Sequence, residues 1–336
     1  METPDPYAPC RLCPRRCGVM RRAGSGRGYC GEGAALRLAC ASIHRGEEPP
    51  LTGTGGSGTI FVSGCSLGCI FCQNRQISRG PRGAAGSADQ VPSGEALGRI
   101  VDAKEFARIC LALQNRGAEN INIVTGTHAV PALVKAIAAA RRDGAALDIP
   151  VLWNSSGYEV PETLDLLSDT VEVFLPDLKT LDSAVSERYF NAPDYPDRAV
   201  GAIQKMLALR PLRFEKRDQG PDRMVSGVMV RHMVLPGCLE STRHVLRWFA
   251  EHCAGRAMLS LMFQYTSISP RGTAPVRRVN KTEYRTVLHW LDECGIEDGY
   301  CQDLSPDARW IPDFEQVNPF PTELSIPVWH WRRGFV

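Results

Sequence analysis

The sequence lacks the features of several large protein classes. None of its apolar runs approaches the roughly 18 to 20 residues that a membrane-spanning helix needs. The formal net charge is only +2, with 39 Lys and Arg against 37 Asp and Glu, whereas nucleic-acid-binding proteins usually carry a clear basic excess. No internal repeat recurs at a fixed period. These absences disfavour a membrane protein, a nucleic-acid-binding protein and a repeat protein.

Cysteine, in contrast, is abundant. The first residues, METPDPYAPCR, lack the apolar core of a secretory signal, so we expect a cytoplasmic protein. Thirteen cysteines are many for that compartment, where disulfides are rare and clustered cysteines more often bind metals or act in catalysis. Seven of the thirteen form two groups within the first 72 residues. The position of these groups therefore decides the functional interpretation.

The pattern of apolar residues predicts an α/β fold. From Gly58 onward, apolar runs of strand length alternate with apolar stripes of helical period, which is typical of a parallel sheet or barrel. Six strand and helix units are fewer than the eight of a closed barrel, so a partial, three-quarter barrel or an open doubly wound sheet fits the count. The six predicted strands are residues 59–63, 120–125, 149–154, 171–176, 228–235 and 258–263.

The same patterns suggest how the chain is divided. Residues 1–50 are rich in arginine, glycine and cysteine and poor in large apolar residues, so we expect a small irregular metal-binding module there. Residues 51–315 form the predicted partial barrel, and residues 316–336 a C-terminal tail. In parallel α/β folds, the functional groups lie at the carboxyl ends of the strands.

The sharpest motif is GCSLGCIFCQN, which directly follows the first predicted strand. It places Cys65, Cys69 and Cys72 at spacings of three and two intervening residues. Thiolates hold iron-sulfur clusters, usually four for each four-iron cube. Three thiolates leave one iron without a protein ligand, and that iron is open to a small chelating molecule. The alternatives are a zinc knuckle or ordinary packing, but no fourth ligand for zinc lies nearby in the sequence.

At these residues the sequence resembles the radical S-adenosylmethionine (SAM) superfamily, whose CxxxCxxC motif has an aromatic residue before the last cysteine, here Phe71. More narrowly, it is similar to relatives of pyruvate formate-lyase activating enzyme with an extra N-terminal cysteine box. The resemblance implies a [4Fe-4S] cluster held by Cys65, Cys69 and Cys72, with SAM on the free iron and the Phe71 backbone facing the adenine. One-electron reduction would then release a 5'-deoxyadenosyl radical, which takes a hydrogen atom from the substrate.

Polar residues at the predicted strand ends are candidate SAM contacts. The second strand ends in TGTH, whereas better-known activating enzymes carry a Gly-Gly-Glu-Pro element at this point. The resemblance matches Lys179 and Arg231 to residues that bind the SAM carboxylate, and a guanidinium is a natural bidentate partner of a carboxylate. The full set of predicted cofactor contacts is Phe71, Thr125, Gly126, Thr127, His128, Asn154, Ser155, Ser156, Asp177, Lys179 and Arg231.

The second cysteine group is Cys10, Cys13, Cys17 and Cys30. Four thiolates around a Gly-rich segment are enough for a tetrahedral zinc or for a fully ligated iron-sulfur cluster, and the sequence does not choose between them. Because the module has almost no apolar core, a bound metal would have to supply its folding free energy. We therefore expect a second metal site.

The substrate and partners are less closely defined by the sequence. Three functions remain open. The protein could activate a glycyl radical enzyme by acting on a glycine of that protein, or it could carry out radical modification of a small molecule or peptide. The third is a non-catalytic scaffold that only binds an iron-sulfur cluster and SAM. His44, Glu47 and Glu48, just before the first strand, are candidates to touch substrate, bind a cation or cap a loop. The N-terminal arginines suit an acidic, low-potential electron donor such as flavodoxin or ferredoxin. We expect neither nucleic-acid nor membrane partners.

Overall fold

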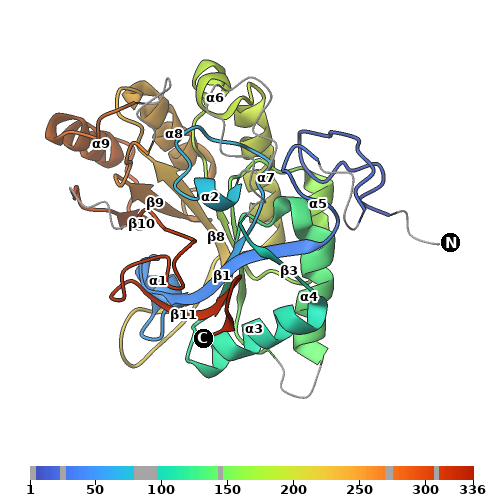
Figure 1. Cartoon of the computed structure of the whole chain (residues 1–336). Helices are drawn as coiled ribbons and strands as arrows, with labels where there is room; N and C mark the ends of the chain where they lie inside the picture. Colours follow the sequence, from blue (N-terminus) through green and yellow to red (C-terminus); the bar gives the residue numbers. More distant parts are fainter. Residues whose placement is uncertain (1–4, 23–27, 79–96, 143–146, 269–274, 306–309) are drawn as a thin grey trace.

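A computed structural model describes residues 5–22, 28–78, 97–142, 147–268, 275–305 and 310–336 (Figure 1). Within these residues, no helix combines the length and the apolar character needed to cross a bilayer. Helices surround a central sheet, and the N-terminal segment lies beside α5 (Pro161–Asp165), where the Thr163 hydroxyl donates a hydrogen bond of 2.8 Å to the Leu12 carbonyl oxygen.

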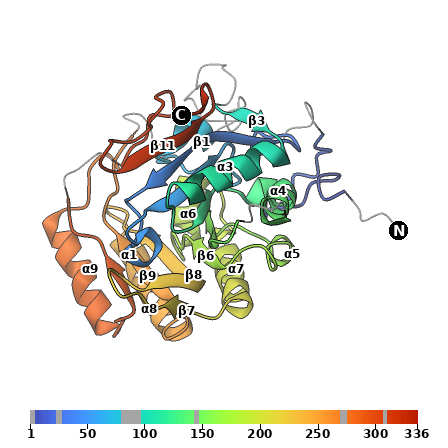
Figure 2. The ribbon, with the colours of Figure 1, turned by 90° about the horizontal axis from the view of Figure 1, so that it is seen from below.

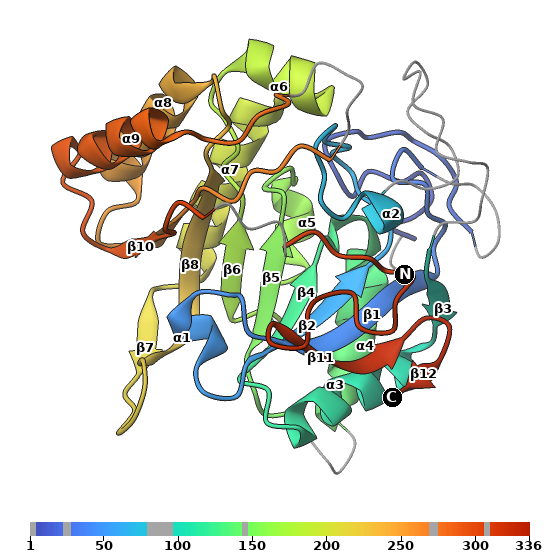
Figure 3. The same cartoon turned by 60° about the vertical axis from the view of Figure 1, so that its left-hand side comes forward.

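All six predicted strands are present, and they pair in parallel in the order β2-β4-β5-β6-β8-β9 (Figure 3). The sheet path runs from β10 (Gly299–Cys301) at one end to β12 (Gly334–Phe335) at the other, and within the described residues these two ends do not pair. The predicted α/β class with an open, mostly parallel sheet is therefore confirmed. The six strands are β2 (Ser57–Val62), β4 (Ile121–Val124), β5 (Val151–Ser155), β6 (Val173–Pro176), β8 (Arg223–Met233) and β9 (Met258–Met262).

The helices follow the outer side of the curved sheet, as Figure 2 shows from below. Helix α3 buries an apolar stripe of helical period, made of Phe106, Ile109, Cys110 and Leu113, and its N-cap Asp102 accepts a hydrogen bond from the Glu105 N–H. The other helices are α1 (Pro49–Thr52), α2 (Arg75–Ser78), α4 (Val130–Arg142), α6 (Ser183–Phe190), α7 (Tyr195–Leu209), α8 (Leu239–His252) and α9 (Lys281–Glu293), with α3 itself at Ala103–Asn115 and a 3-10 turn at Thr127–Ala129.

Antiparallel strands extend the sheet beyond β2. Strand β1 (Leu36–His44) pairs with β2 on one side and with β11 (Ser325–His330) on the other. Through these pairings the sheet includes residues from the range 1–50 assigned to the module and from the range 316–336 assigned to the tail. Strand β1 is also almost wholly buried. Four short strands complete the fold: β3 (Arg99–Val101), β7 (Arg213–Glu215), β10 (Gly299–Cys301) and β12 (Gly334–Phe335).

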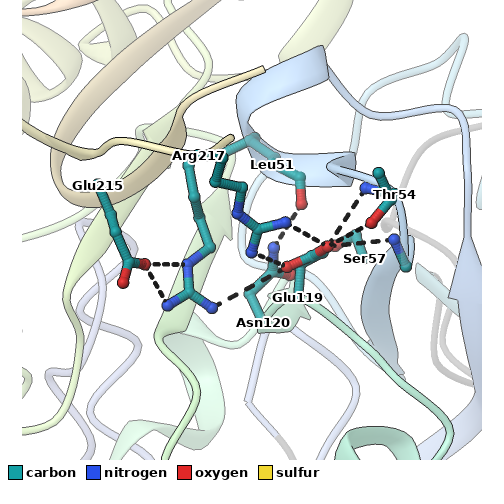
Figure 4. A network of polar contacts seen from close by, with 9 residues as sticks. Leu51, Thr54, Ser57, Glu119, Asn120, Glu215 and Arg217 are labelled. Atoms are coloured by element: carbon teal, nitrogen blue, oxygen red, sulfur yellow. Dashed lines mark hydrogen bonds and ion pairs between the residues drawn. The ribbon is translucent and has the colours of Figure 1, made fainter. Parts of the chain in front are cut away.

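A polar network fixes the segment between β1 and β2 at the amino end of the sheet (Figure 4). Glu119, just before β4, accepts hydrogen bonds from the backbone N–H groups of Thr54 (3.2 Å) and Gly55 (3.1 Å). The same carboxylate accepts a bond of 2.8 Å from Arg217, which lies beyond β7. Helix α1 is therefore held where it crosses the sheet face and contacts β8 (Figure 3).

Candidate functional site

The loop after β2 carries the three-cysteine motif on a tightly packed backbone. Gly64 has a φ of +90°, and a Cβ atom there would lie 3.0 Å from the Cys30 carbonyl oxygen and 2.6 Å from Glu32 Cγ. Only glycine fits such a close approach at positive φ. The Leu67 N–H donates to Cys65 Sγ at 3.4 Å, so the backbone already directs a donor at one of the three sulfurs. The cysteine loop therefore packs closely at Gly64 against the segment that carries Cys30.

The three cysteines open onto one cavity of about 510 Å³ at the carboxyl ends of the parallel strands. This position is where ligands bind in such sheets. Most of the predicted cofactor contacts line the same cavity, although they come from five different strands or loops. They are Phe71, Thr125, Asn154, Ser155, Ser156, Asp177, Lys179 and Arg231, together with Cys65, Cys69 and Cys72.

The TGTH segment divides between the cavity and the protein interior. Thr125 lines the cavity with a φ of +63°, which is uncommon for a β-branched residue and is typical of strained functional positions. Gly126, Thr127 and His128 are not among the residues that line the cavity. The Thr127 hydroxyl instead donates a 3.1 Å hydrogen bond to Glu159.

Glu159 is a buried carboxylate that the sequence analysis did not select. It accepts hydrogen bonds from Trp153 Nε1 (2.7 Å), Ser155 Oγ (2.9 Å) and Thr127 Oγ1 (3.1 Å). Burial raises the pKa of Glu159, and the three donors oppose that effect. This carboxylate joins the ends of β4 and β5 and orients Ser155, so it shapes the cavity wall without lining it. The sequence signal that could have indicated Glu159 is its position, four residues after the strand-end Ser155.

His128 contacts the start of the cysteine loop from the protein interior. Its Nε2 donates a 2.8 Å hydrogen bond to the Ser63 carbonyl oxygen, one residue before Gly64. Burial, reinforced by the nearby Arg21 cation, lowers the pKa of His128 to about 3, so the ring is neutral near pH 7. In this position His128 holds the start of the cysteine loop.

Lys179 brings a cation to the cluster side of the cavity. Its Nζ forms a 2.5 Å ion pair with Asp177 Oδ2. Burial alone would lower the pKa of Lys179, but Asp177 and then Cys69 raise it above its ordinary value. The ammonium group is therefore charged and lies near both a carboxylate and a cysteine of the motif.

Arg231 is paired with two glutamates across the cavity. Its Nε donates a 3.0 Å hydrogen bond to Glu48, and its Nη2 contacts both Glu47 and Glu48. Burial alone would lower the pKa of Arg231, but Glu48 and Glu47 raise it above its ordinary value. Glu47 also accepts from Asn122 at 3.0 Å. All of the charge contacts shown for this guanidinium are thus made by residues of the segment between β1 and β2.

Two of the four N-terminal cysteines, Cys17 and Cys30, lie on either side of Gly28. A Cβ atom at Gly28 would lie 3.1 Å from Cys17 Sγ and 3.6 Å from Cys30 Sγ, so the glycine leaves room beside both sulfurs. Cys10, Cys13 and Cys30 are buried, and Cys17 is exposed. In the described part of the chain, no three His, Cys, Asp or Glu side chains converge as the ligands of a single metal ion.

Comparison with known proteins finds a family model that matches the central part of the sheet. Residues 59–212, just under half of the chain, match the family model of the radical SAM superfamily. The matched region begins at β2 and includes the cysteine loop, β4, β5 and β6. The matched family implies a [4Fe-4S] cluster and SAM.

Individual relatives are more distant. The chain is 27% identical over 258 residues to the Methanocaldococcus jannaschii protein named Uncharacterized protein MJ0674, covering 76% of this chain and 65% of that protein. The match thus spans less than two thirds of that relative's length. Similar solved structures include a radical SAM methyltransferase from Sphaerobacter thermophilus (14% identity, TM-score 0.48, 73% of this chain and 66% of that one). Another is Streptococcus suis SuiB bound to S-adenosylmethionine (13% identity, TM-score 0.47, 71% and 48%).

The residues of the cysteine loop suit the implied cluster. Each thiolate of a four-iron cube binds a different iron atom, so its three sulfurs face a shared space and need not converge on one point. Cys65, Cys69 and Cys72 line one cavity in this way. Burial raises the pKa of the Cys69 and Cys72 thiols, and iron ligation supplies the positive charge that stabilises thiolates against it.

Proposed function

We propose that the protein is a radical SAM enzyme that cleaves SAM reductively to a 5'-deoxyadenosyl radical, which then abstracts a hydrogen atom from a substrate. One observation carries this proposal: Cys65, Cys69 and Cys72 line the same cavity as the polar strand ends Asn154 and Lys179. The cluster and SAM supply the difficult chemical step, and this chain supplies orientation and exclusion of water.

The cavity provides complementary groups for a zwitterionic nucleotide. Lys179 offers a cation for a carboxylate, and Asn154, Ser155 and Ser156 offer donors and acceptors for ribose hydroxyls. Both cations already have carboxylate partners, but Lys179 is paired with Asp177, whereas Arg231 is held by two glutamates, Glu47 and Glu48. We therefore assign the SAM carboxylate first to Lys179.

The size of the cavity favours a small reacting group. A volume of about 510 Å³ lies in the range that single small-molecule sites occupy. The cluster and SAM would share this volume with the reacting group of the substrate, which favours a small group, and glycine is the smallest residue of a protein. Activation of a glycyl radical enzyme is the substrate proposal that follows from the sequence resemblance, with flavodoxin or ferredoxin as electron donor. Modification of a small molecule or peptide is the alternative.

Anaerobic reconstitution tests this function. We expect wild-type protein with dithionite and SAM to release 5'-deoxyadenosine, and Cys65→Ala to release none. Equal amounts from both proteins would contradict the enzyme and leave a SAM-binding scaffold. Addition of a candidate glycyl radical enzyme should then give a protein radical in the electron paramagnetic resonance (EPR) spectrum. Absence of that radical, with 5'-deoxyadenosine still formed, favours the small-molecule or peptide alternative.

We further propose that Cys10, Cys13, Cys17 and Cys30 hold a metal centre. Arg21 is only 2% exposed, and its described hydrogen bonds go to the carbonyl oxygens of Gly33 and His128 and, at 3.5 Å, to Cys10 Sγ. None of these partners is a carboxylate, yet a buried cation without a counter-charge is costly. Four thiolates around a divalent metal or an iron-sulfur cluster would provide the negative charge.

Elemental analysis tests the second site. We expect Cys65→Ala protein, which lacks the loop ligand, to retain zinc or iron that is lost when Cys10→Ser and Cys13→Ser are added to the same protein. The retained element distinguishes zinc from an iron-sulfur cluster. Equal metal content in both proteins would contradict a centre at the N-terminal cysteines.

A further inference from the structure

Arg15 connects the four-cysteine module to the cluster loop. It lies between Cys13 and Cys17, and its guanidinium donates to Ser66 O at 3.0 Å and to Leu67 O at 2.8 Å. Two further bonds reach the carbonyl oxygens of Phe190 (3.0 Å) and Asn191 (2.6 Å) at the end of α6. One planar side chain therefore binds four backbone carbonyls, two of them between Cys65 and Cys69.

Aromatic rings hold the guanidinium in place. Its carbon lies 4.1 Å from the centre of the Tyr29 ring and 5.3 Å from that of Tyr158. Tyr29 also packs on the loop itself, because a Cβ atom at Gly68 would lie 3.1 Å from its hydroxyl oxygen. A guanidinium stacks on ring faces in this way and still directs its N–H groups in the ring plane.

The contact with Ser66 continues to a cluster sulfur through a single peptide group. The carbonyl of Ser66 and the N–H of Leu67 belong to the same planar peptide and point in opposite directions. Arg15 donates to the carbonyl end at 3.0 Å, while the N–H end donates to Cys65 Sγ at 3.4 Å. A cation on the carbonyl polarises the peptide and strengthens the N–H donor on its far side.

We propose that Arg15 is a positioning residue that raises the reduction potential of the cluster at Cys65, Cys69 and Cys72 through the Ser66–Leu67 peptide. Hydrogen bonds to the sulfurs and nearby charge are among the factors that set iron-sulfur potentials. Both effects of Arg15 favour the reduced, more negative cluster. This inference rests on the proposed cluster at these cysteines, and it gives one residue of the N-terminal module a defined effect on electron uptake.

Redox titration of anaerobically reconstituted protein, followed by the EPR signal of the reduced cluster, tests the proposal. The test variant is Arg15→Gln, and the matched control is Arg11→Gln, which removes the same charge from an exposed position of the module. At equal iron content, we expect the ratio of reduced to oxidised cluster at a fixed potential to fall about threefold to tenfold in Arg15→Gln. Tenfold corresponds to about 59 mV for one electron. Arg11→Gln should titrate like wild type.

Two outcomes would overturn the proposal: an unchanged midpoint in Arg15→Gln, or an equal shift in Arg11→Gln. If Arg15→Gln does not load iron, Arg15→Lys is tested instead, because lysine keeps the positive charge but loses the forked guanidinium donors. A downward shift of the midpoint potential, smaller than that expected for Arg15→Gln, supports the proposal. An unchanged midpoint potential in Arg15→Lys contradicts the proposal. A purely structural role predicts a lower unfolding midpoint with an unchanged potential in the loaded fraction. If wild-type protein itself gives no cluster signal, it is the proposed function that fails.

Discussion

Ser155 Oγ donates a 2.9 Å hydrogen bond to Glu159 Oε2 inside the protein. Ser155 lines the cavity and Glu159 does not, so the carboxylate acts on the cavity wall from the interior. Side chains that are aimed by buried partners of this kind usually depend on them for their orientation.

We predict that Glu159→Gln lowers the free energy of unfolding by about 1 to 3 kcal/mol, because an amide has one acceptor oxygen for the three donors that the carboxylate satisfies. Urea unfolding under anaerobic conditions measures the change. Glu162→Gln, an exposed residue of α5, is the control and should change stability by less than about 0.5 kcal/mol. Equal stability of the two variants would contradict the claim that the Glu159 carboxylate stabilises the protein by accepting these three hydrogen bonds.

We predict that Arg231→Met destabilises the protein by about 3 to 5 kcal/mol, since it leaves Glu47 and Glu48 largely buried without their cation. Neutralising both glutamates in the same protein, by Glu47→Gln and Glu48→Gln, should recover much of the loss. Comparison of the single and combined variants by urea unfolding isolates the charge effect. No recovery on neutralisation would contradict the pairing.

Glu283 gives a prediction for acid stability. Hydrogen bonds from Arg277, and from the backbone of Asn280 and Gly237, lower the pKa of Glu283 to about 2. Because the folded-state pKa lies below the unfolded value of about 4.3, the stabilisation is complete above roughly pH 5 and is lost as the pH falls toward 2. We expect wild type to exceed Glu283→Gln by on the order of 1 to 3 kcal/mol at neutral pH, with the difference shrinking through that range.

Unfolding measured at a series of pH values tests this dependence. Exposed Glu297→Gln is the control and should leave the acid limb of the stability curve unchanged. A stability difference between wild type and Glu283→Gln that stays constant, or grows, as the pH falls would contradict the assignment.

The parallel strands and the outer helices could be read from local pattern. Buried strands show continuous apolar runs, and the stripe of Phe106, Ile109, Cys110 and Leu113 repeats with helical period. The sheet position of β1 could not be predicted in this way. Leu36–His44 follows an arginine-rich, irregular segment, and its partner β11 lies almost 300 residues further along the chain.

The cavity was partly predictable for a similar reason. The ends of parallel strands meet at one edge, so Asn154, Asp177 and Lys179 could be placed together from sequence. Pairings between distant segments could not, because no local pattern connects Arg231 with Glu47, 184 positions away. Nor could one arginine of the N-terminal module be distinguished from the others before the structure placed Arg15 on the cysteine loop.

The central claim is a cluster held by three thiolates, and EPR spectroscopy of reduced, oxygen-free protein tests it most directly. We predict the signal of a reduced [4Fe-4S] cluster that changes when SAM is added and that is lost from the loop site in Cys65→Ala, Cys69→Ala and Cys72→Ala. A spectrum without such a cluster, or one that SAM leaves unaltered, would contradict the account.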